Sequence, residues 1–312
     1  MKAIEIVGLS KRYGAVNALD GLNLSVEEGS IFGFLGPNGA GKTTTLRILT
    51  GLANASGGEA CIAGVPVTDR IATANVVGYL PEEPAFYRWM TPFEFLDHVG
   101  RIFGQPADDR KRQARQLLEL VGLSEVINRR IGGFSRGMRQ RLGLAQALMN
   151  DPQVLLLDEP VSALDPIGRK EVLEMIAALK GTATVFMSTH ILADVERICD
   201  TVGIIDHGKL VTEGDRVEML ARYHMDTFDI EVAIGQEPAL SAWLTGLKMD
   251  WIKGKTQKGA RAHITVKDVN RARSELLRLL GESKLVIQRF EVAAPDLEDV
   301  FLHLVAKNGG SK

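Results

Sequence analysis

A short glycine-rich segment, GPNGAGKT, has the residue types and spacing of a phosphate-binding loop. Its three glycines let the backbone turn tightly and aim N–H groups at an anion, with no Cβ in the way: Gly36, Gly39 and Gly41. Lys42 can bridge the β- and γ-phosphates of a nucleotide, and the Thr43 hydroxyl can ligate Mg²⁺. We therefore predict a nucleotide site that also includes Asn38 and Thr44.

The setting of this loop also favours a nucleotide. The apolar run IFGFLG precedes the loop and suits a buried strand, whereas TTLRILTGL follows it with helical spacing. The positive end of that helix would point at the phosphates. The alternative is a chance glycine-rich turn before a helix, but the strand, the lysine and the threonine stand in the order that a phosphate site requires.

Two carboxylates and a histidine follow apolar runs further along the chain. Asp158 and Glu159 end the run VLLLDEP, where Asp158 can hold Mg²⁺ through water and Glu159 can act as general base. His190 ends the run TATVFMSTH and can reach a γ-phosphate. Open α/β sheets bind ligands at the carboxyl ends of their strands, so we favour these roles. Solvated loop charges and a satisfied polar histidine are the alternatives.

Two further features could contact a nucleotide. Ser135 and Gly137 stand where a helix begins, and Ser135 can cap it, which makes a second anion-binding helix terminus. Its alternative is a plain capped helix. Tyr13 lies in a turn-rich connection and could stack on an adenine ring. An ordinary half-buried tyrosine fits the same pattern.

The composition is that of a globular protein of one large or two ordinary domains: 312 residues, 45% hydrophobic and 24% charged. A net charge of −2 gives no electrostatic reason to expect direct binding of nucleic acid. Cys61 and Cys199 stand far apart without metal-ligand neighbours, so we read both as small core residues. No run approaches the 18 apolar residues of a membrane span, so any crossing must come from another chain.

The remaining elements alternate strands and helices and then change character. We expect strands over 2–9 and 22–27 joined by a turn-rich connection, strands near 57–67 and 75–80, mainly helices over 93–150, and a hairpin over 202–214. From about Asp226 the order becomes β-α-β-β-α-β, which fits a small ferredoxin-like α+β domain. A last amphipathic helix carries Leu297, Val300, Phe301 and Leu304.

Taken in order, these motifs resemble the ATP-binding cassette of ABC transporters over about residues 2–220. GPNGAGKT is similar to the Walker A motif, VLLLDEP to Walker B with Glu159 as catalytic glutamate, and SRGMRQR to the family signature. SALD resembles the D-loop, with Asp165, and His190 the switch histidine. The resemblance also makes Tyr13 the adenine-stacking aromatic.

The resemblance implies a fold and a mechanism. The fold is an α/β P-loop NTPase cassette over 1–222, with a mixed sheet and a helical subdomain at about 84–150, followed by an accessory α+β domain over 226–307. Lys42, Thr43, Asp158 and Glu159 of one cassette would act on MgATP. The Ser135-to-Gly137 terminus of a second would contact the same γ-phosphate. Dimerisation, with itself or with a paired cassette subunit, is therefore expected.

Two positions depart from the family pattern. The common signature LSGGQ is here Phe134-Ser135-Arg136-Gly137-Met138, which keeps the serine and the second glycine and adds a cation. Glu82, in LPEEP, stands where the family often has a glutamine that senses Mg²⁺ and water. A glutamate can still ligate Mg²⁺, but it adds negative charge near the triphosphate.

The ending PDLEDVFLHL resembles that of ATP-binding subunits serving ABC-2-type export permeases. We expect a cytoplasmic ATPase subunit on the inner face of the cell membrane, energising an integral-membrane ABC-2-type permease, with a regulatory or dimer-stabilising C-terminal domain. Phe86, Tyr87 and Trp89 are candidates for the permease contact, or else subdomain core. The alternative functions are a non-transport ABC ATPase in a soluble assembly or nucleic-acid-handling complex, and a cassette that binds ATP without turnover.

Overall fold

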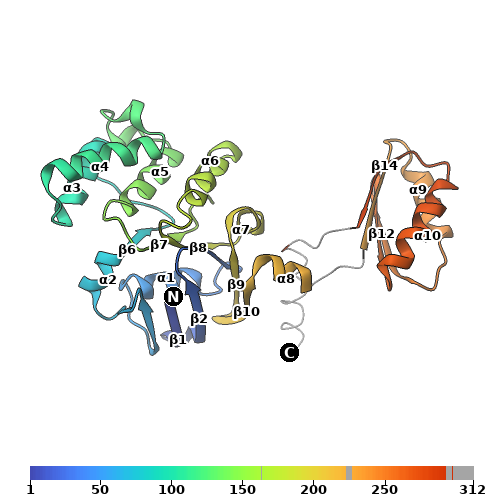
Figure 1. Ribbon diagram of the computed structural model, residues 1–312, viewed down its shortest axis with the longest axis horizontal. Coiled ribbons are helices and arrows are strands. Elements are labelled where there is room, and N and C mark those ends of the chain that lie inside the picture. Colours follow the sequence, from blue (N-terminus) through green and yellow to red (C-terminus); the bar gives the residue numbers. More distant parts are fainter. Residues whose placement is uncertain (163, 223–226, 293–296, 298–312) are drawn as a thin grey trace. The chain divides into compact units, whose positions relative to one another are not determined.

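The computed structural model describes residues 1–162, 164–222, 227–292 and 297 (Figure 1). The described residues fall into two compact units, 1–218 and 219–302. The first is built on two sheets with helices around them, and the second on one sheet with two helices.

A six-stranded sheet forms the centre of the first unit. Its order is β10 (Lys209–Asp215), β9 (Thr201–Asp206), β3 (Ile31–Leu35), β8 (Thr184–Thr189), β7 (Val154–Asp158) and β6 (Val77–Leu80). All neighbours pair in parallel except the β9–β10 hairpin. Every residue of β3, β7 and β8 is buried, which explains why these strands read as unbroken apolar runs. Their carboxyl ends carry the predicted site residues.

An antiparallel sheet lies beside it, in the order β2 (Val16–Glu27), β1 (Lys2–Tyr13), β4 (Gly57–Ile62) and β5 (Val65–Pro66). The expected long connection between the first two strands was wrong, because β1 and β2 continue almost to Gly14 as one hairpin. The pairing has several register shifts along its length, and Gly8 and Gly21 have φ of +59° and +69°. Bulges of this kind let glycines remain inside a long strand pair.

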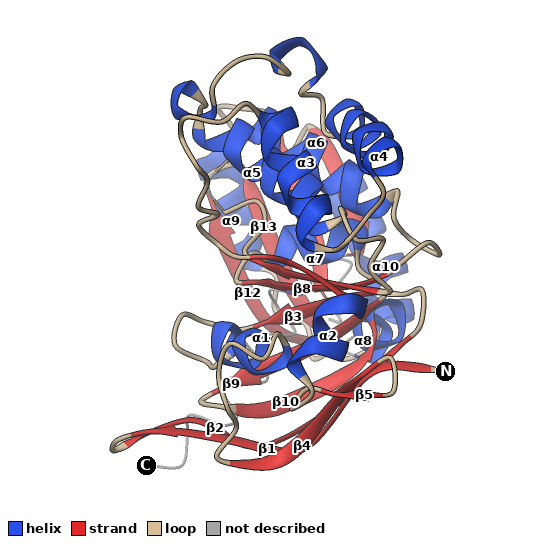
Figure 2. Cartoon of the chain, turned by 90° about the vertical axis from the view of Figure 1, so that its left-hand side faces the viewer, coloured by secondary structure: helices blue, strands red, loops and turns tan. Residues whose placement is uncertain are grey.

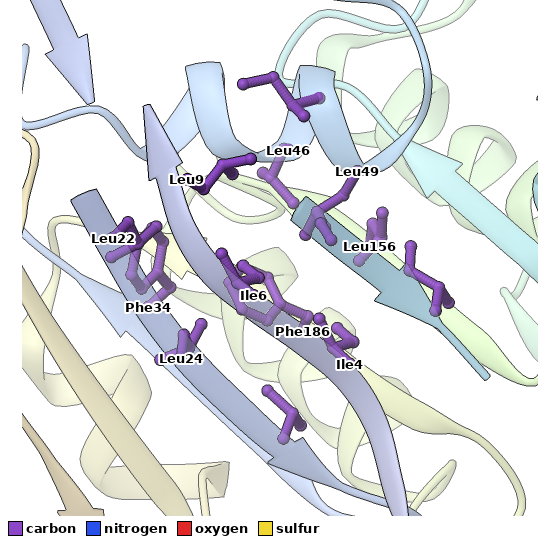
Figure 3. Close-up of a cluster of buried hydrophobic side chains, with 14 of the residues drawn as sticks. Ile4, Ile6, Leu9, Leu22, Leu24, Phe34, Leu46, Leu49, Leu156 and Phe186 are labelled. Carbon is purple, nitrogen blue, oxygen red and sulfur yellow. The ribbon is translucent and has the colours of Figure 1, made fainter. Parts of the chain in front are cut away.

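The core of this unit lies between the two sheets and encloses α1 (Lys42–Leu49). Figure 3 shows Leu46 and Leu49 of this helix among side chains from strands of both sheets, such as Ile6 of β1 and Phe186 of β8. Buried leucines of this kind each contribute about 2–5 kcal/mol when compared with alanine. The helix that begins at the phosphate loop is therefore fixed by the main core of the unit.

Three of the remaining helices of the first unit lie together. α3 (Pro92–Ile102), α4 (Ala107–Leu120) and α5 (Arg136–Ala147) gather at the end of the unit away from β1 and β4, as Figures 1 and 2 show. A capping box between Thr91 and Glu94 starts α3. The other helices of the unit are α6 (Pro166–Ala177), α7 (Leu192–Ile198) and α2 (Arg70–Val76), and α8 (Arg216–Arg222) spans the boundary between the units. Our sequence analysis missed α2.

The second unit has the predicted β-α-β-β-α-β order: β11 (Thr227–Val232), α9 (Glu237–Gly246), β12 (Ile252–Lys258), β13 (Arg261–Val266), α10 (Val269–Gly281) and β14 (Ile287–Val292). Its sheet is antiparallel in the order β12-β13-β11-β14, as in a ferredoxin-like domain. Trp251 and residues of α9 and α10 pack on one face of that sheet. The predicted last helix lies outside the described residues apart from Leu297, which is buried.

Candidate nucleotide site

A pocket opens at the carboxyl ends of the central strands, around the predicted phosphate loop. It is lined by Ala18, Asn38, Gly39, Gly41, Lys42, Thr43, Thr44, Glu82, Glu159 and His190. Nine of these ten residues belong to the set predicted from the sequence. The pocket thus gathers side chains from segments more than a hundred residues apart.

The glycines of the loop are fixed by their surroundings. A Cβ on Gly36 would lie 2.3 Å from the carbonyl oxygen of Ile205, and one on Gly41 would lie 2.7 Å from that of Ala18. Gly41 also has φ of +112°, which side-chain-bearing residues rarely adopt. Larger residues would therefore displace the loop from the strands that hold it.

Lys42 is a buried cation held over the loop. Its Nζ donates to the carbonyl oxygens of Gly36 at 2.7 Å and Pro37 at 3.2 Å, and it lies 3.6 Å from Oε1 of Glu159. Burial lowers the pKa of Lys42, and the nearby Glu159 carboxylate opposes that shift. An anionic phosphate would replace the lost hydration of this ammonium group.

Thr43 and Asp158 form the part of the site that fits Mg²⁺. The Thr43 hydroxyl donates to Oδ1 of Asp158 at 3.2 Å, and the Ser188 hydroxyl donates to the same oxygen at 2.6 Å. Burial raises the pKa of Asp158, and these two hydrogen bonds oppose the shift. No cluster of three or more His, Cys, Asp or Glu side chains suited to a metal occurs in the described part of the chain. One carboxylate with one hydroxyl suits a magnesium ion that takes its other ligands from phosphate and water.

Glu159 sits on strained backbone. Its φ is +48°, a left-handed conformation that costs a non-glycine residue about 1 kcal/mol or more. Its N–H donates to the carbonyl oxygen of Ser188 at 3.1 Å, and both carboxylate oxygens lie 2.9 Å from Nδ1 of His190. The carboxylate is thereby turned into the pocket between Lys42 and His190.

Six predicted residues do not line the pocket: Tyr13, Gly36, Ser135, Gly137, Asp158 and Asp165. Ser135, Gly137 and Asp165 stand at helix starts. Ser135 caps α5 by accepting a hydrogen bond from the N–H of Met138, and Asp165 caps α6 by accepting one from Gly168. Both caps are exposed. A Cβ on Gly137 would lie 3.4 Å from a methyl carbon of Leu164, so the two helix starts are neighbours. Within one chain these residues do not line the site that holds Lys42.

Tyr13 also lies outside the pocket lining. It ends β1 with 47% of its surface exposed, and the ammonium group of Lys11 stands 4.8 Å from its ring centre. The same hairpin contributes Ala18 to the pocket. Tyr13 therefore belongs to the same hairpin as a pocket residue but does not itself line the pocket in this conformation.

Several contacts of the site were absent from our sequence analysis. Ser188 reaches the site because β8 pairs with β3 and β7, and Ala18 because β2 packs against the loop at Gly41. No motif marks either residue. Glu82 lines the pocket as predicted and is exposed. In the described residues, no helix has the length and apolar character needed to cross a bilayer.

Comparisons with known proteins match both units. Residues 19–162 match the family described as ABC transporter, and residues 214–305 match the C-terminal domain of DrrA1-3-like ATP-binding proteins. An uncharacterised ABC transporter ATP-binding protein, YxlF of Bacillus subtilis, is 40% identical over 97% of this chain and 99% of its own. The linearmycin resistance ATP-binding protein LnrL of the same organism is 31% identical over 97% of this chain and 98% of its own.

A solved structure of an ATP-binding subunit of an ABC transporter is also similar. It is 30% identical, has a TM-score of 0.65, and the match covers 71% of this chain and 93% of that one. The predicted P-loop cassette, with a mixed sheet and helices, is therefore confirmed. Proteins of this kind bind ATP and work as dimers with transmembrane permeases. From its phosphate loop to its C-terminal unit, this chain belongs to the ATP-binding subunits of the ABC transporter family.

Proposed function

We propose that this chain binds MgATP and hydrolyses it as the energy-coupling subunit of a membrane exporter, acting through a separate ABC-2-type permease. The observation that carries this proposal is the contact of Lys42, Glu159 and His190 in one pocket, beside the Thr43–Asp158 pair. Lys42 for the phosphates, Glu159 as the base for water and the Thr43 hydroxyl for magnesium then line one pocket, and Thr43 is hydrogen-bonded to Asp158.

The chemistry follows from these positions. Lys42 and the N–H groups at the start of α1 would hold the β- and γ-phosphates and stabilise charge in the transition state. Mg²⁺, bound by Thr43 and Asp158, would supply further charge neutralisation. Glu159 would orient water for in-line attack and accept its proton, while His190 keeps the carboxylate aimed into the pocket.

The active form is a dimer in this proposal. Ser135, Gly137 and Asp165 lie outside their own chain's pocket, and the first and last are exposed. A second cassette would bring its α5 terminus to the γ-phosphate, where backbone N–H groups and the helix dipole favour an anion. ATP would then hold two subunits together, and hydrolysis would release them. Tyr13 would stack on the adenine, and Glu82 would face the Mg²⁺ and water.

The permease would dock on an exposed aromatic pair beside α3. Tyr87 and Trp89 are 53% and 62% exposed, and their ring centres lie 6.0 Å apart. Exposed aromatics of this kind are enriched at protein interfaces. Phe86, in contrast, packs edge-on against Phe95 and belongs to the helical subdomain core. The export direction rests on relatives such as the linearmycin resistance protein.

Co-purification tests this function. The tagged chain is recovered from its native cells in mild detergent, and its ATPase activity is measured before and after separation from bound proteins. A stoichiometric polytopic membrane protein, together with magnesium-dependent ATP hydrolysis, is expected. A purely soluble complex would contradict the exporter assignment, and the absence of hydrolysis would contradict the ATPase assignment.

A further inference from the structure

Helix α6 is joined to the helices on either side of it by ion pairs. Glu171 pairs with Arg141 of α5. On its other side, Arg169 pairs with Asp194 of α7 at 2.6 Å. Figure 1 shows the three helices following one another along the edge of the first unit. The ion pairs therefore form a continuous link from α5 through α6 to α7.

The Arg169–Asp194 pair is the buried member of this link. Asp194 is 1% exposed, its Oδ1 accepts a hydrogen bond from Nε of Arg169 at 2.6 Å, and Nη2 of the same guanidinium lies 2.6 Å from that oxygen as an ion pair. Its Oδ2 is buried and has no hydrogen-bond partner in the described part of the chain. A single guanidinium thus compensates this carboxylate, and moving α6 away from α7 would leave a buried charge unpaired.

Asp194 feels the charges of the candidate site in addition to that of Arg169. Burial raises the pKa of Asp194, the guanidinium of Arg169 opposes that shift, and the charges of Glu159 and His190 also act on it. Asp194 stands four residues after His190, in the first turn of α7. A displacement of this helix start is therefore also a displacement of the segment that carries His190.

The three linked helices begin at the residues that we assign to contacts between subunits or to the γ-phosphate. α5 begins after Ser135 and α6 after Asp165, and both caps are exposed. α7 begins just after His190 and Ile191. A partner subunit that contacts the first two helix starts would push on α5 and α6, which are joined by Arg141 and Glu171.

We propose that Arg169 and Asp194 are positioning residues that transmit the arrival of a partner subunit at α6 to His190. They thereby make hydrolysis depend on closure of the dimer. This inference rests on the proposed ATPase function. The buried pair moves α7 together with α6, so that a partner seated on α6 would hold the His190–Glu159 contact, which one chain already makes, in the orientation that hydrolysis needs.

A purely structural role of the Arg169–Asp194 pair predicts a different outcome from a positioning role. A second ion pair between the same two helices serves to distinguish these roles. Glu174 and Arg197 also join α6 to α7, at 3.1 Å, but both side chains are exposed. An exposed pair contributes little to stability and does not leave a buried charge when broken. Arg197→Gln is therefore the control for the loss of an ion pair between the same two helices.

The experiment compares Asp194→Asn, Arg169→Gln, their double variant and Arg197→Gln in the full chain. We expect Asp194→Asn to lower kcat about tenfold, with the dissociation constant for ATP within about twofold of wild type. Arg169→Gln should do the same, and the double variant should be no worse than either one, because the two residues act as a unit. Arg197→Gln should leave both values unchanged.

Amide hydrogen exchange gives a second readout that needs no turnover. In the Glu159→Gln background, ATP should protect the amides of residues 189–198 in the presence of the Arg169–Asp194 pair and fail to do so after Asp194→Asn. Unchanged kcat and unchanged protection in Asp194→Asn would overturn the inference, as would a parallel loss of ATP binding and thermal stability. Inactivity of the wild-type chain would instead contradict the ATPase function itself.

Discussion

Nδ1 of His190 lies 2.9 Å from both carboxylate oxygens of Glu159. One ring nitrogen thus faces both carboxylate oxygens, while Nζ of Lys42 lies 3.6 Å from Oε1. These contacts leave the carboxylate little freedom to turn away from the pocket. The backbone of Glu159 is also held in a left-handed conformation, with a positive φ. The site is preorganised around this one acid.

Glu159→Gln tests the assignment of the base. The amide keeps the shape of the side chain but cannot accept a proton from water, so kcat should fall by about 100-fold or more while ATP still binds. ATP should then hold the chain as a dimer, which size-exclusion chromatography with and without ATP would detect. Near-normal turnover would remove Glu159 from the role of base. Glu83→Gln, an exposed position outside the pocket lining, is the control.

Gly36→Ala tests the geometry of the phosphate loop. The new Cβ would meet the carbonyl oxygen of Ile205 at 2.3 Å, so the loop must shift and ATP affinity should fall about tenfold or more. Gly57→Ala is the matched control, because a Cβ there meets nothing within 4 Å. Binding of a fluorescent ATP analogue measures both. Equal affinities in the two variants would show that the loop does not need the close approach at Gly36.

Trp89→Ser, combined with Tyr87→Ser, tests the docking surface for the permease. Both rings are exposed, so their removal should leave the ATPase activity of the isolated chain unchanged. Recovery of the membrane partner in co-purification should fall about tenfold, because aromatic anchors carry a large share of interface energy. Val7→Ser, an exposed apolar position on β1, is the control. Full recovery of the partner by the double variant would place the docking surface elsewhere.

The two cysteines should differ in reactivity. Burial raises the pKa of the Cys199 thiol well above its usual range, with the charges of Asp200 and Asp194 adding to the shift, whereas Cys61 is only half-buried. Because the thiolate is the reactive form, a thiol reagent at pH 8 should label Cys61 in the native chain and Cys199 only after denaturation. Mass spectrometry of the labelled peptides measures this. Rapid native labelling of Cys199 would contradict the burial.

Asp194 should make stability depend on pH. Its folded-state pKa is raised by burial, so the folded chain binds this proton more tightly than the unfolded chain. The associated stability is fully present below the unfolded carboxyl pKa of about 4 and is lost as pH rises through the folded value. Relative to Asp194→Asn, the wild-type chain should therefore lose unfolding free energy as pH is raised from about 4 through the folded-state pKa.

Urea unfolding at several pH values measures this difference. The unfolding transition whose midpoint changes when ATP is added belongs to the first unit, because a ligand stabilises only the unit that binds it. A difference between wild type and Asp194→Asn that stays constant across this range would contradict the raised pKa.

The phosphate loop and the carboxylates could be predicted because the residues that give each its chemistry are consecutive in the sequence. Gly36 to Thr43 act through backbone and side chains of one turn, and Asp158 and Glu159 follow a strand whose apolar run marks its end. Ser188, Arg169 and Asp194 act only through partners that are more than twenty residues away in sequence, so no local pattern identified them.

Local patterns also failed at two structural elements. α2 is a seven-residue helix with a single buried residue, Thr73, and therefore has no apolar period to detect. The β1–β2 hairpin contains glycines that normally indicate turns, but Gly8 and Gly21 sit inside paired strands where register shifts absorb them. The cross-strand pairing overrode the local preference of glycine for turns.

The left-handed backbone at Glu159 has a consequence for how this chain would respond to selection in the laboratory. Glycine relieves such a conformation, so Glu159→Gly should recover about 1 kcal/mol of backbone strain, but it also removes the carboxylate beside the buried Lys42 and the acid needed for catalysis. A screen for activity would therefore never recover this variant. The acid at this position sets relief of backbone strain against catalysis within one residue.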